Sequence, residues 1–214
     1  MTLTKRDEEY VVLLNGKTLM SSRMHGSEEA LATAGCQHLR TAERPRVLVG
    51  GLGMGFTLGA ALDCLPPAAV VVVAELVPAV VEWNRGPLAS VAGHRLDDPR
   101  VQVEEGDVGA AMRSARARFD AVLLDVDNGP AALTDDANAS LYDDRGVAAT
   151  RASLKRGGVL AIWMSAEDRR YERRLRGAGF HVRVERVRGR LKQGGPRHSI
   201  LVAQVGSASP AESA

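Results

Sequence analysis

The sequence predicts an α/β fold built around a mostly parallel sheet of seven strands. After Pro45, short segments rich in valine and leucine alternate with segments of helical character. These apolar segments are almost free of charge, which is typical of parallel strands with helices covering both faces of their sheet. A glycine-rich turn at residues 51–55 follows the first of them. Ligands of open α/β sheets bind at the carboxyl ends of the strands, where this turn is expected.

The elements of this sheet are expected in a regular order. Strands are predicted at residues 46–50, 69–75, 101–104, 119–125, 159–164, 180–187 and 199–205. Helices are predicted between them at residues 57–65, 78–85, 108–117, 145–154 and 167–179. Only a basic loop at 188–198 joins the last two strands, so they are predicted to form a C-terminal antiparallel hairpin at the sheet edge.

The chain before Pro45 predicts a smaller unit. Residues 8–13 and 17–22 favour a short N-terminal β-hairpin, because Asn15-Gly16 between them is a turn signal. Ser27 is expected to cap a short helix that ends near Arg40. We therefore expect three parts: 1–44 as hairpin and helix, 45–206 as the nucleotide-binding domain, and 207–214 as a disordered tail.

Composition narrows the class of protein. The 214 residues are 45% apolar and 25% charged, as in an ordinary globular protein. No apolar run is long enough to span a membrane, and the charged N-terminus does not match a signal peptide, so a cytoplasmic location is expected. Cys36 and Cys64 are expected to be free thiols, and no metal site is predicted.

Charge says less about partners. The net charge of +2 disfavours nucleic acid, although arginines gather between residues 169 and 197. Solvated helix and strand faces explain most of these arginines. A role in holding an acidic substrate or partner stays open.

The glycine turn carries the strongest chemical signal. Glycines at 51, 53 and 55, directly after Gly50, let the backbone turn sharply and approach a ligand closely. The following helix offers unpaired N–H groups at its start. A dinucleotide fingerprint would require glycine at position 56, which is Phe56. The turn therefore favours S-adenosylmethionine over a nicotinamide cofactor.

Acidic residues follow the next three strands. Glu75 is placed to accept hydrogen bonds from ribose hydroxyls. Asp107, beside Val108, is placed to accept the adenine amino group or to cap the next helix. Asp125 could act as a general base or bind a cationic acceptor, and its simpler role is a loop or cap hydrogen bond.

Five βα units that end in a hairpin are the layout of class I methyltransferases. Within that fold, the chain resembles the spermidine synthase (polyamine aminopropyltransferase) family from about Met20 to Gln204. The segments that carry the resemblance are Arg46–Gly55, Val73–Val81, Asp98–Val101 with Gly106-Asp107, Phe119–Pro130 and Ser140–Gly158. The resemblance implies a site for S-adenosylmethionine or its decarboxylated form. The residues expected to form it are Gly50, Gly51, Gly53, Gly55, Glu75, Asp107, Val108 and Asp125, with Asp125 catalytic.

The chain departs from the family pattern where the family binds the free amine of the donor and where it binds the acceptor. Gly53 replaces the acidic residue that meets the free amine of the decarboxylated donor, and Asn128 replaces a polyamine-binding Asp. Met24 and Gly26 replace the Tyr and Glu that flank His25. Each lost hydrogen bond to a charged group costs about 1.5–3 kcal/mol of recognition. These departures favour methyl transfer to an unknown small-molecule acceptor.

Two other functions remain as alternatives. One is a polyamine aminopropyltransferase with a diverged acceptor site, and the other is a non-catalytic scaffold of the same fold that uses its basic C-terminal hairpin as a contact surface. A nicotinamide-dependent oxidoreductase is disfavoured by Phe56. The family's dimers commonly form through the N-terminal region, which is short here, so the sequence leaves a homodimer open.

Overall fold

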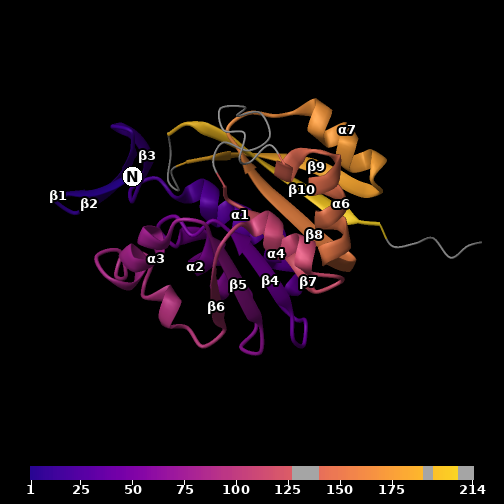
Figure 1. The fold of residues 1–214 in the computed structure, drawn as a ribbon, viewed down its shortest axis with the longest axis horizontal. Helices are drawn as coiled ribbons and strands as arrows, with labels where there is room; N and C mark the ends of the chain where they lie inside the picture. The colour runs from indigo at the N-terminus through magenta and orange to yellow at the C-terminus, as the bar shows by residue number, and fades with distance from the viewer. Residues whose placement is uncertain (127–139, 190–194, 207–214) are drawn as a thin grey trace, which may run out of the picture.

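A seven-stranded sheet forms the centre of the protein in a computed structural model that describes residues 1–126, 140–189 and 195–206 (Figure 1). The strand order is β6-β5-β4-β7-β8-β10-β9. The strands are β4 (Arg46–Gly50), β5 (Val70–Glu75), β6 (Val101–Glu105), β7 (Phe119–Leu124), β8 (Leu154–Met164), β9 (Phe180–Arg188) and β10 (Arg197–Val205). The first five pair in parallel, and β10 lies antiparallel between β8 and β9. The predicted fold class, including the C-terminal hairpin, is confirmed.

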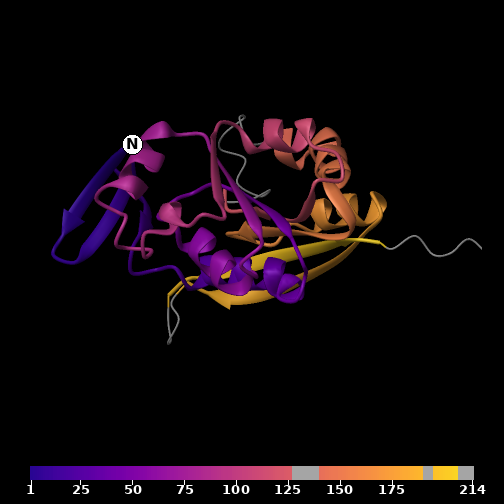
Figure 2. The ribbon, with the colours of Figure 1, turned by 90° about the horizontal axis from the view of Figure 1, so that it is seen from below.

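Helices cover both faces of this sheet. The helices α1 (Gly26–Cys36), α2 (Phe56–Cys64) and α3 (Pro78–Arg85) share one core cluster, and α4 (Val108–Ser114), α6 (Asp144–Ser153) and α7 (Arg169–Gly177) share the other. Along β4, Val47 and Val49 face the first cluster while Leu48 faces the second. Figure 2 shows α1 and α2 on the opposite side of the sheet from α4 and α6. Strands that are buried on both faces explain the continuous apolar segments of the sequence.

The N-terminal hairpin is in fact a three-stranded antiparallel sheet. Strands β2 (Glu9–Leu14) and β3 (Lys17–Ser21) match the expected hairpin, and β1 (Thr2–Arg6) adds a third strand against β2. Strand β1 was not predicted, because almost all of its side chains are exposed and it therefore lacks an apolar face. This small sheet lies to one side of the large one (Figure 1), and Val12 of β2 packs with Met54 of the glycine turn and Leu88, which follows α3.

The start of α1 also differs from the expectation. The cap position is His25, no side chain caps the helix, and the Ser27 hydroxyl donates instead to the carboxylate of Glu28 at 2.6 Å. The helix packs in the core of the large sheet through Leu31 and other buried residues. Its packing therefore groups α1 with the large sheet rather than with the small one.

The bounds of the other elements agree with the expected ones within a few residues, except that β8 begins earlier. The structure also contains two short 3-10 helices that were not predicted, η1 (Gln37–Leu39) and η2 (Arg95–Asp97). Strand β8 begins at Leu154, which pairs with Phe119 across an irregularity in the ladder. The expected disordered tail at 207–214, and Asn128 of the acidic loop, lie outside the described residues. None of the helices within the described ranges is both long and apolar enough to cross a membrane.

The close packing of α1 on the sheet generates a test with a matched control. A Cβ at Gly35 would collide with the Leu123 side chain and lie 3.2 Å from the Ala161 Cβ, whereas a Cβ at Gly177 in α7 would meet nothing within 4 Å. We expect Gly35→Ala to lower the free energy of unfolding by about 1–3 kcal/mol, because overpacking outweighs the helix preference of alanine. Gly177→Ala should be neutral or stabilising by up to about 1 kcal/mol. Equal effects of the two changes in urea unfolding would contradict the packing described here.

Candidate active site

The glycine loop lies where the carboxyl ends of β4, β5 and β7 meet. Gly51, Gly53 and Gly55 all have left-handed backbones, with φ angles of +85°, +53° and +83°. Gly55 is the cap residue of α2, and no side chain caps this helix. The loop therefore has backbone conformations that other residues rarely adopt, and it leads into an open helix N-terminus.

The loop is held tightly between its neighbouring strands. The Gly51 N–H donates to the Ala74 carbonyl oxygen of β5, and the Asp125 N–H donates to the Gly50 carbonyl oxygen, both at 2.9 Å. A Cβ at Gly51 would collide with the Asp125 carbonyl oxygen, and one at Gly50 would lie 2.7 Å from Val108 Cγ2. Glycine is required at both positions because neighbouring atoms already fill the space of a side chain.

Glu75 fastens this loop from β5. Its side chain is buried, with 7% exposure, and one carboxylate oxygen accepts the Leu52 N–H while the other accepts the Val77 N–H, both at 2.8 Å. A carboxylate can accept about four hydrogen bonds, so each oxygen keeps capacity for another donor. Glu75 thus has a structural role in shaping the loop, and its expected contact with ribose stays a prediction.

Asp107 fulfils the second of its two expected roles. Its carboxylate accepts the Ala110 N–H at 2.7 Å, which caps α4, and pairs with Arg113 at 3.0 Å. The contact with adenine remains a prediction. Val108, directly after it, is buried with 5% exposure and packs beside Gly50.

Two further residues position the loop and were not expected from the sequence. The Asn84 side chain of α3 donates to the Gly53 carbonyl oxygen at 2.8 Å and to the Val80 carbonyl oxygen at 2.9 Å. Met20 of β3 covers Gly53, since its sulfur would lie 3.5 Å from a Cβ at that position. A polar residue on the apolar side of α3, beside Val80 and Val81, was the available signal for Asn84.

Asp125 is the most perturbed acid of this site. Its carboxylate accepts a 2.6 Å hydrogen bond from the hydroxyl of Thr57, which lies in the first turn of α2 and is 1% exposed. Burial, reinforced by the nearby negative charge of Glu28, raises the pKa of Asp125 to about 7, and the Thr57 hydrogen bond opposes this rise. A carboxylate with a pKa near neutrality can accept or release a proton under ordinary conditions.

Helix α1 adds a second group of side chains to the site. Burial raises the pKa of Glu28, although the hydroxyl of Ser27 lowers it. The His25 ring stacks on Phe56 with centroids 4.2 Å apart and contacts Glu29 through Nδ1 at 2.7 Å. Since Phe56 begins α2, this stack joins the start of α1 to the end of the glycine loop. Thr57 was missed as a site residue, and the sequence left open whether Glu28 reaches the site, because only the fold brings α1 to the end of β7.

The strand order of the large sheet, with its antiparallel strand near one edge, defines an α/β protein with the class I methyltransferase fold. No protein-family model matches the chain. A curated protein of Nitrosomonas europaea, named polyamine aminopropyltransferase, is 35% identical over 123 residues. That match covers 56% of this chain and 34% of the relative, so the chain corresponds to about a third of the relative's length.

Solved structures confirm the fold. The spermidine synthase of Thermotoga maritima superposes with a TM-score of 0.72 and 22% identity, and covers 96% of this chain and 72% of its own. A spermidine synthase in complex with the transition-state analogue AdoDATO gives 0.71 and 20% over the same shares. Human methyltransferase-like protein 13 in complex with SAH gives 0.63 and 21%, over 85% of this chain and 81% of its own. The chain is thus similar to spermidine synthases within the methyltransferase fold, as the sequence motifs predicted.

The raised pKa of Asp125 predicts a pH-dependent stability difference. Because its folded pKa of about 7 lies above the ordinary 3.8, the side chain favours folding below pH 4 and loses that contribution as the pH rises through 7. Asp125→Asn keeps an acceptor for the Thr57 hydroxyl but cannot ionise. The free energy of unfolding of this variant, relative to that of the parent protein, should therefore increase as the pH rises from about 4 to about 7. The gain should not exceed about 4 kcal/mol.

Chemical unfolding at about pH 5 and about pH 8.5 measures this difference. Glu43→Gln is the control, because Glu43 is exposed. A constant stability difference between the parent protein and Asp125→Asn at both pH values would contradict the proposed environment of Asp125.

Proposed function

We propose that this chain is a transferase that uses an S-adenosyl sulfonium donor, and that it transfers an aminopropyl group to an amine. The observation that carries the proposal is the pair of carboxylates Asp125 and Glu28 at the end of β7, beside the glycine loop. Two acids on the acceptor side suit a cationic amine, because their carboxylates can replace the water molecules that the ammonium group loses when it binds. The similarity to a polyamine aminopropyltransferase and to spermidine synthases supports the same reaction.

The residues around the loop fit an adenosyl group. Gly51 and Gly53 would let the backbone approach the donor closely, Glu75 would accept the ribose hydroxyls with its remaining capacity, and Asp107 with Val108 would border the adenine. When bound, such a donor supplies a carbon attached to positively charged sulfur, which leaves as a neutral thioether. The complexes of similar proteins with AdoDATO and with SAH support a donor of this class, either S-adenosylmethionine or its decarboxylated form.

Asp125 would act as the general base. An approaching ammonium group lowers the pKa of a nearby carboxylate, so Asp125 would be ionised when a cationic acceptor is bound. Its oxygen would then take a proton from the bound ammonium group, which leaves the nitrogen an electron pair to bond to the donor carbon while the carbon–sulfur bond breaks and the sulfur leaves as a neutral thioether. The Thr57 hydroxyl, hydrogen bonded to one oxygen, would hold the carboxylate in one orientation.

Glu28 would bind the charge of the acceptor. The sequence lacks two of the acceptor-side acids expected by resemblance, and Glu28 on α1 supplies a carboxylate from another element of the fold. His25 and Phe56, which stack on each other, would provide a flat wall next to it. A short diamine or polyamine fits these features, because it combines cationic ends with an apolar stem.

Methyl transfer is the second candidate, and one observation favours it. Position 53 is a glycine covered by the thioether of Met20, so the loop has no carboxylate there to meet the free amine of a decarboxylated donor. The two reactions give different products: aminopropyl transfer from decarboxylated S-adenosylmethionine releases methylthioadenosine, whereas methyl transfer from S-adenosylmethionine releases S-adenosylhomocysteine.

Product analysis tests the proposed function. We expect methylthioadenosine when the protein is given decarboxylated S-adenosylmethionine and putrescine or spermidine, and a loss of about 10²–10⁴-fold in kcat for Asp125→Asn. Glu43→Gln, an exposed acid before β4 and therefore at the opposite end of that strand from the glycine loop, should keep the parent activity. Formation of S-adenosylhomocysteine alone would replace the proposal by methyl transfer. Absence of any product, together with no effect of either donor on thermal stability, would favour the non-catalytic scaffold.

Removing the charge of Glu28 should change both the KM for the acceptor and the pH dependence of the rate. Glu28→Gln should raise the KM for a cationic acceptor by about 10-fold or more, because a hydrogen bond to a charged group contributes about 1.5–3 kcal/mol. It should also shift the acidic limb of the pH–rate profile to lower pH, since removing the neighbouring negative charge lowers the pKa of Asp125. An unchanged KM and pH profile would show that Glu28 does not take part in acceptor binding.

A further inference from the structure

Trp163 of β8 is the neighbour of Asp125 across the sheet. Leu124 is the register partner of Ile162 in the parallel ladder of β7 and β8, and both pack in the core cluster that contains α7. The next residue of each strand points to the other face, so Asp125 and Trp163 lie side by side toward α1. Trp163 indeed packs with the core cluster that contains α1. A group bound at Asp125 would therefore meet Trp163 on the side of β8.

His198 of β10 lies next to Trp163 on the same face. The centroids of the two rings are 4.6 Å apart, and the rings are tilted by 39°. His198 pairs with Val187 of β9, which packs with the same core cluster as Trp163. A Cβ at Gly189 would lie 3.4 Å from His198 Nε2, and the Gly189 carbonyl oxygen accepts the N–H of Gly26 at 3.0 Å. The two rings thus lie beside the start of α1, the helix that brings the second carboxylate to the site.

Each of these rings has a polar atom that lacks a partner. Trp163 Nε1 and His198 Nδ1 are buried and have no hydrogen-bond partner among the described residues. Burial also lowers the pKa of His198, so its ring is neutral at pH 7. Buried polar atoms of proteins are nearly always hydrogen bonded, because leaving one unpaired is costly. Two such atoms in neighbouring rings, beside a reactive carboxylate, indicate a place where a ligand binds.

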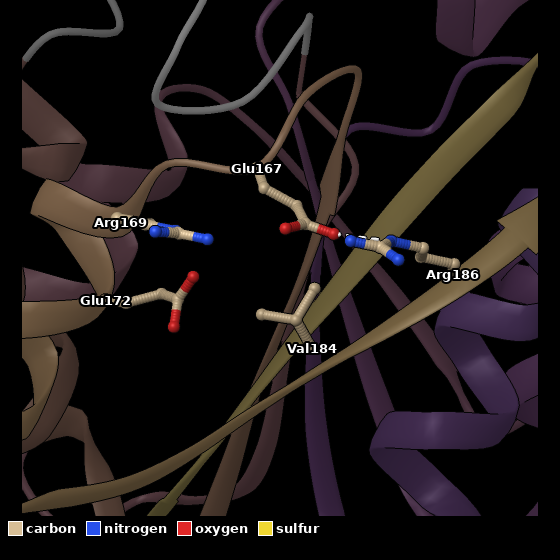
Figure 3. Close-up of a pocket in the computed structure, with 5 residues that line it drawn as sticks. All are labelled: Glu167, Arg169, Glu172, Val184 and Arg186. Carbon is tan, nitrogen blue, oxygen red and sulfur yellow. Dashed lines mark hydrogen bonds and ion pairs between the residues drawn. The ribbon is translucent and has the colours of Figure 1, made fainter.

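The groove between α7 and β9 shows the opposite situation. Figure 3 shows Glu167 joined to Arg186 in this groove, which has a volume of about 590 Å³. Their ion pair measures 2.8 Å, and Glu172 in the same groove pairs with Arg176 at 3.1 Å. Both acids of the groove are already paired with bases, whereas the two ring nitrogens on the other face of the sheet are not. The ring nitrogens are therefore the better candidate for a ligand contact.

We propose that Trp163 and His198 bind the far end of the acceptor, and that this end is an uncharged group able both to accept and to donate a hydrogen bond. The inference rests on the proposed function, in which Asp125 and Glu28 hold the reacting amine at the near end. A hydroxyl group meets the requirement, and so does a second amine in its neutral form. The acceptor is thereby narrowed to an amine with one charged end when bound.

The chemistry of the two nitrogens selects such a group. The indole Nε1–H of Trp163 can only donate, so its partner must offer a free electron pair, which an ammonium group lacks. The Nδ1 atom of a neutral imidazole accepts or donates according to its tautomer, so the partner of His198 can do either. Neither ring is charged, and neither can offset the cost of removing a full charge of either sign from water.

Binding of matched amines tests the proposal. The ligands are alkylamines, amino alcohols and diamines with chains of three to five carbons, titrated calorimetrically into the full chain in the presence of methylthioadenosine. We expect the best amino alcohol to bind about tenfold more tightly than the alkylamine of the same length, because its hydroxyl satisfies buried groups that the alkylamine leaves unpaired. Equal affinities at every length would overturn the proposal.

The diamines distinguish the two sources of an uncharged end. An alkylamine has a pKa close to that of lysine, about 10.4, so the second amine is almost fully protonated at pH 7. If the rings bind the neutral amine, the affinity of the diamine relative to the amino alcohol should rise about tenfold per pH unit between pH 7 and pH 9. This ratio removes the ionisation of Asp125, which affects both ligands alike.

Two other results of the same titration are decisive. A constant ratio in favour of the amino alcohol identifies a hydroxyl as the bound group and supports the proposal. A constant ratio in favour of the diamine would mean that the far end binds as a cation, and would overturn it.

Two variants assign the contact to these residues. Trp163→Phe and His198→Phe each keep an aromatic ring and remove its polar atoms, so each should reduce the preference for the amino alcohol to less than about threefold. The affinity for the alkylamine should stay unchanged, which also shows that the fold is intact. His181→Phe is the matched control, because His181 is exposed at the opposite end of β9 and should keep the full preference. A full preference in both ring variants would overturn the proposal.

Product analysis separates this inference from the proposed function. A protein that binds the amino alcohol with the expected preference but forms neither methylthioadenosine nor S-adenosylhomocysteine would keep the specificity and lose the transferase. A protein that forms methylthioadenosine with the same kcat/KM for an alkylamine and for the matched amino alcohol would keep the transferase and overturn the role of Trp163 and His198. Failure of every amine to bind would overturn both.

Discussion

The site depends on the close approach of the glycine loop to the end of β7. The carbonyl oxygen of Asp125 occupies the space that a side chain at Gly51 would need, and the backbone of Asp125 is bonded to Gly50. This contact places the Asp125 carboxylate beside the first turn of α2, where Thr57 donates to it. One backbone constraint therefore sets both the shape of the loop and the position of the acid. Residues that shape the loop from elsewhere, such as Glu75 and Asn84, act on the same arrangement.

The electrostatics of the site favour function over stability. Asp125 is held among buried groups with Glu28 near it, and the rise of its pKa to about 7 means that the ionised form is costly in the folded protein. Active sites commonly keep acids in such surroundings, because a pKa near the working pH suits proton transfer. A cationic acceptor would relieve this cost by supplying the missing positive charge. The carboxylates would thus be stabilised most when an amine is bound.

The arginine-rich C-terminal part is less one-sided in charge in the folded protein than it is in the sequence. As a run of residues it is strongly basic, yet helix α7 and strand β9 bring acids such as Glu167 and Glu172 next to its arginines. The pairing produces a surface of mixed charge at the β9 edge of the large sheet. Exposed ion pairs of this kind contribute little to stability.

The sequence alone determined the order of the elements, the parallel sheet with its terminal hairpin, and the glycine loop, because buried parallel strands and left-handed turns leave local patterns of valine and glycine. It did not reveal β1, whose exposed side chains carry no such pattern, and it assigned Ser27 a cap that the chain does not use. It named Asp125 but could not find its partners. Thr57 and Glu28 lie 68 and 97 positions from Asp125 in the chain, and only the packing of α1 and α2 against the sheet brings them to the same strand end. Tertiary structure decided the chemistry of the acid, since a pKa depends on burial and neighbouring charge rather than on local sequence.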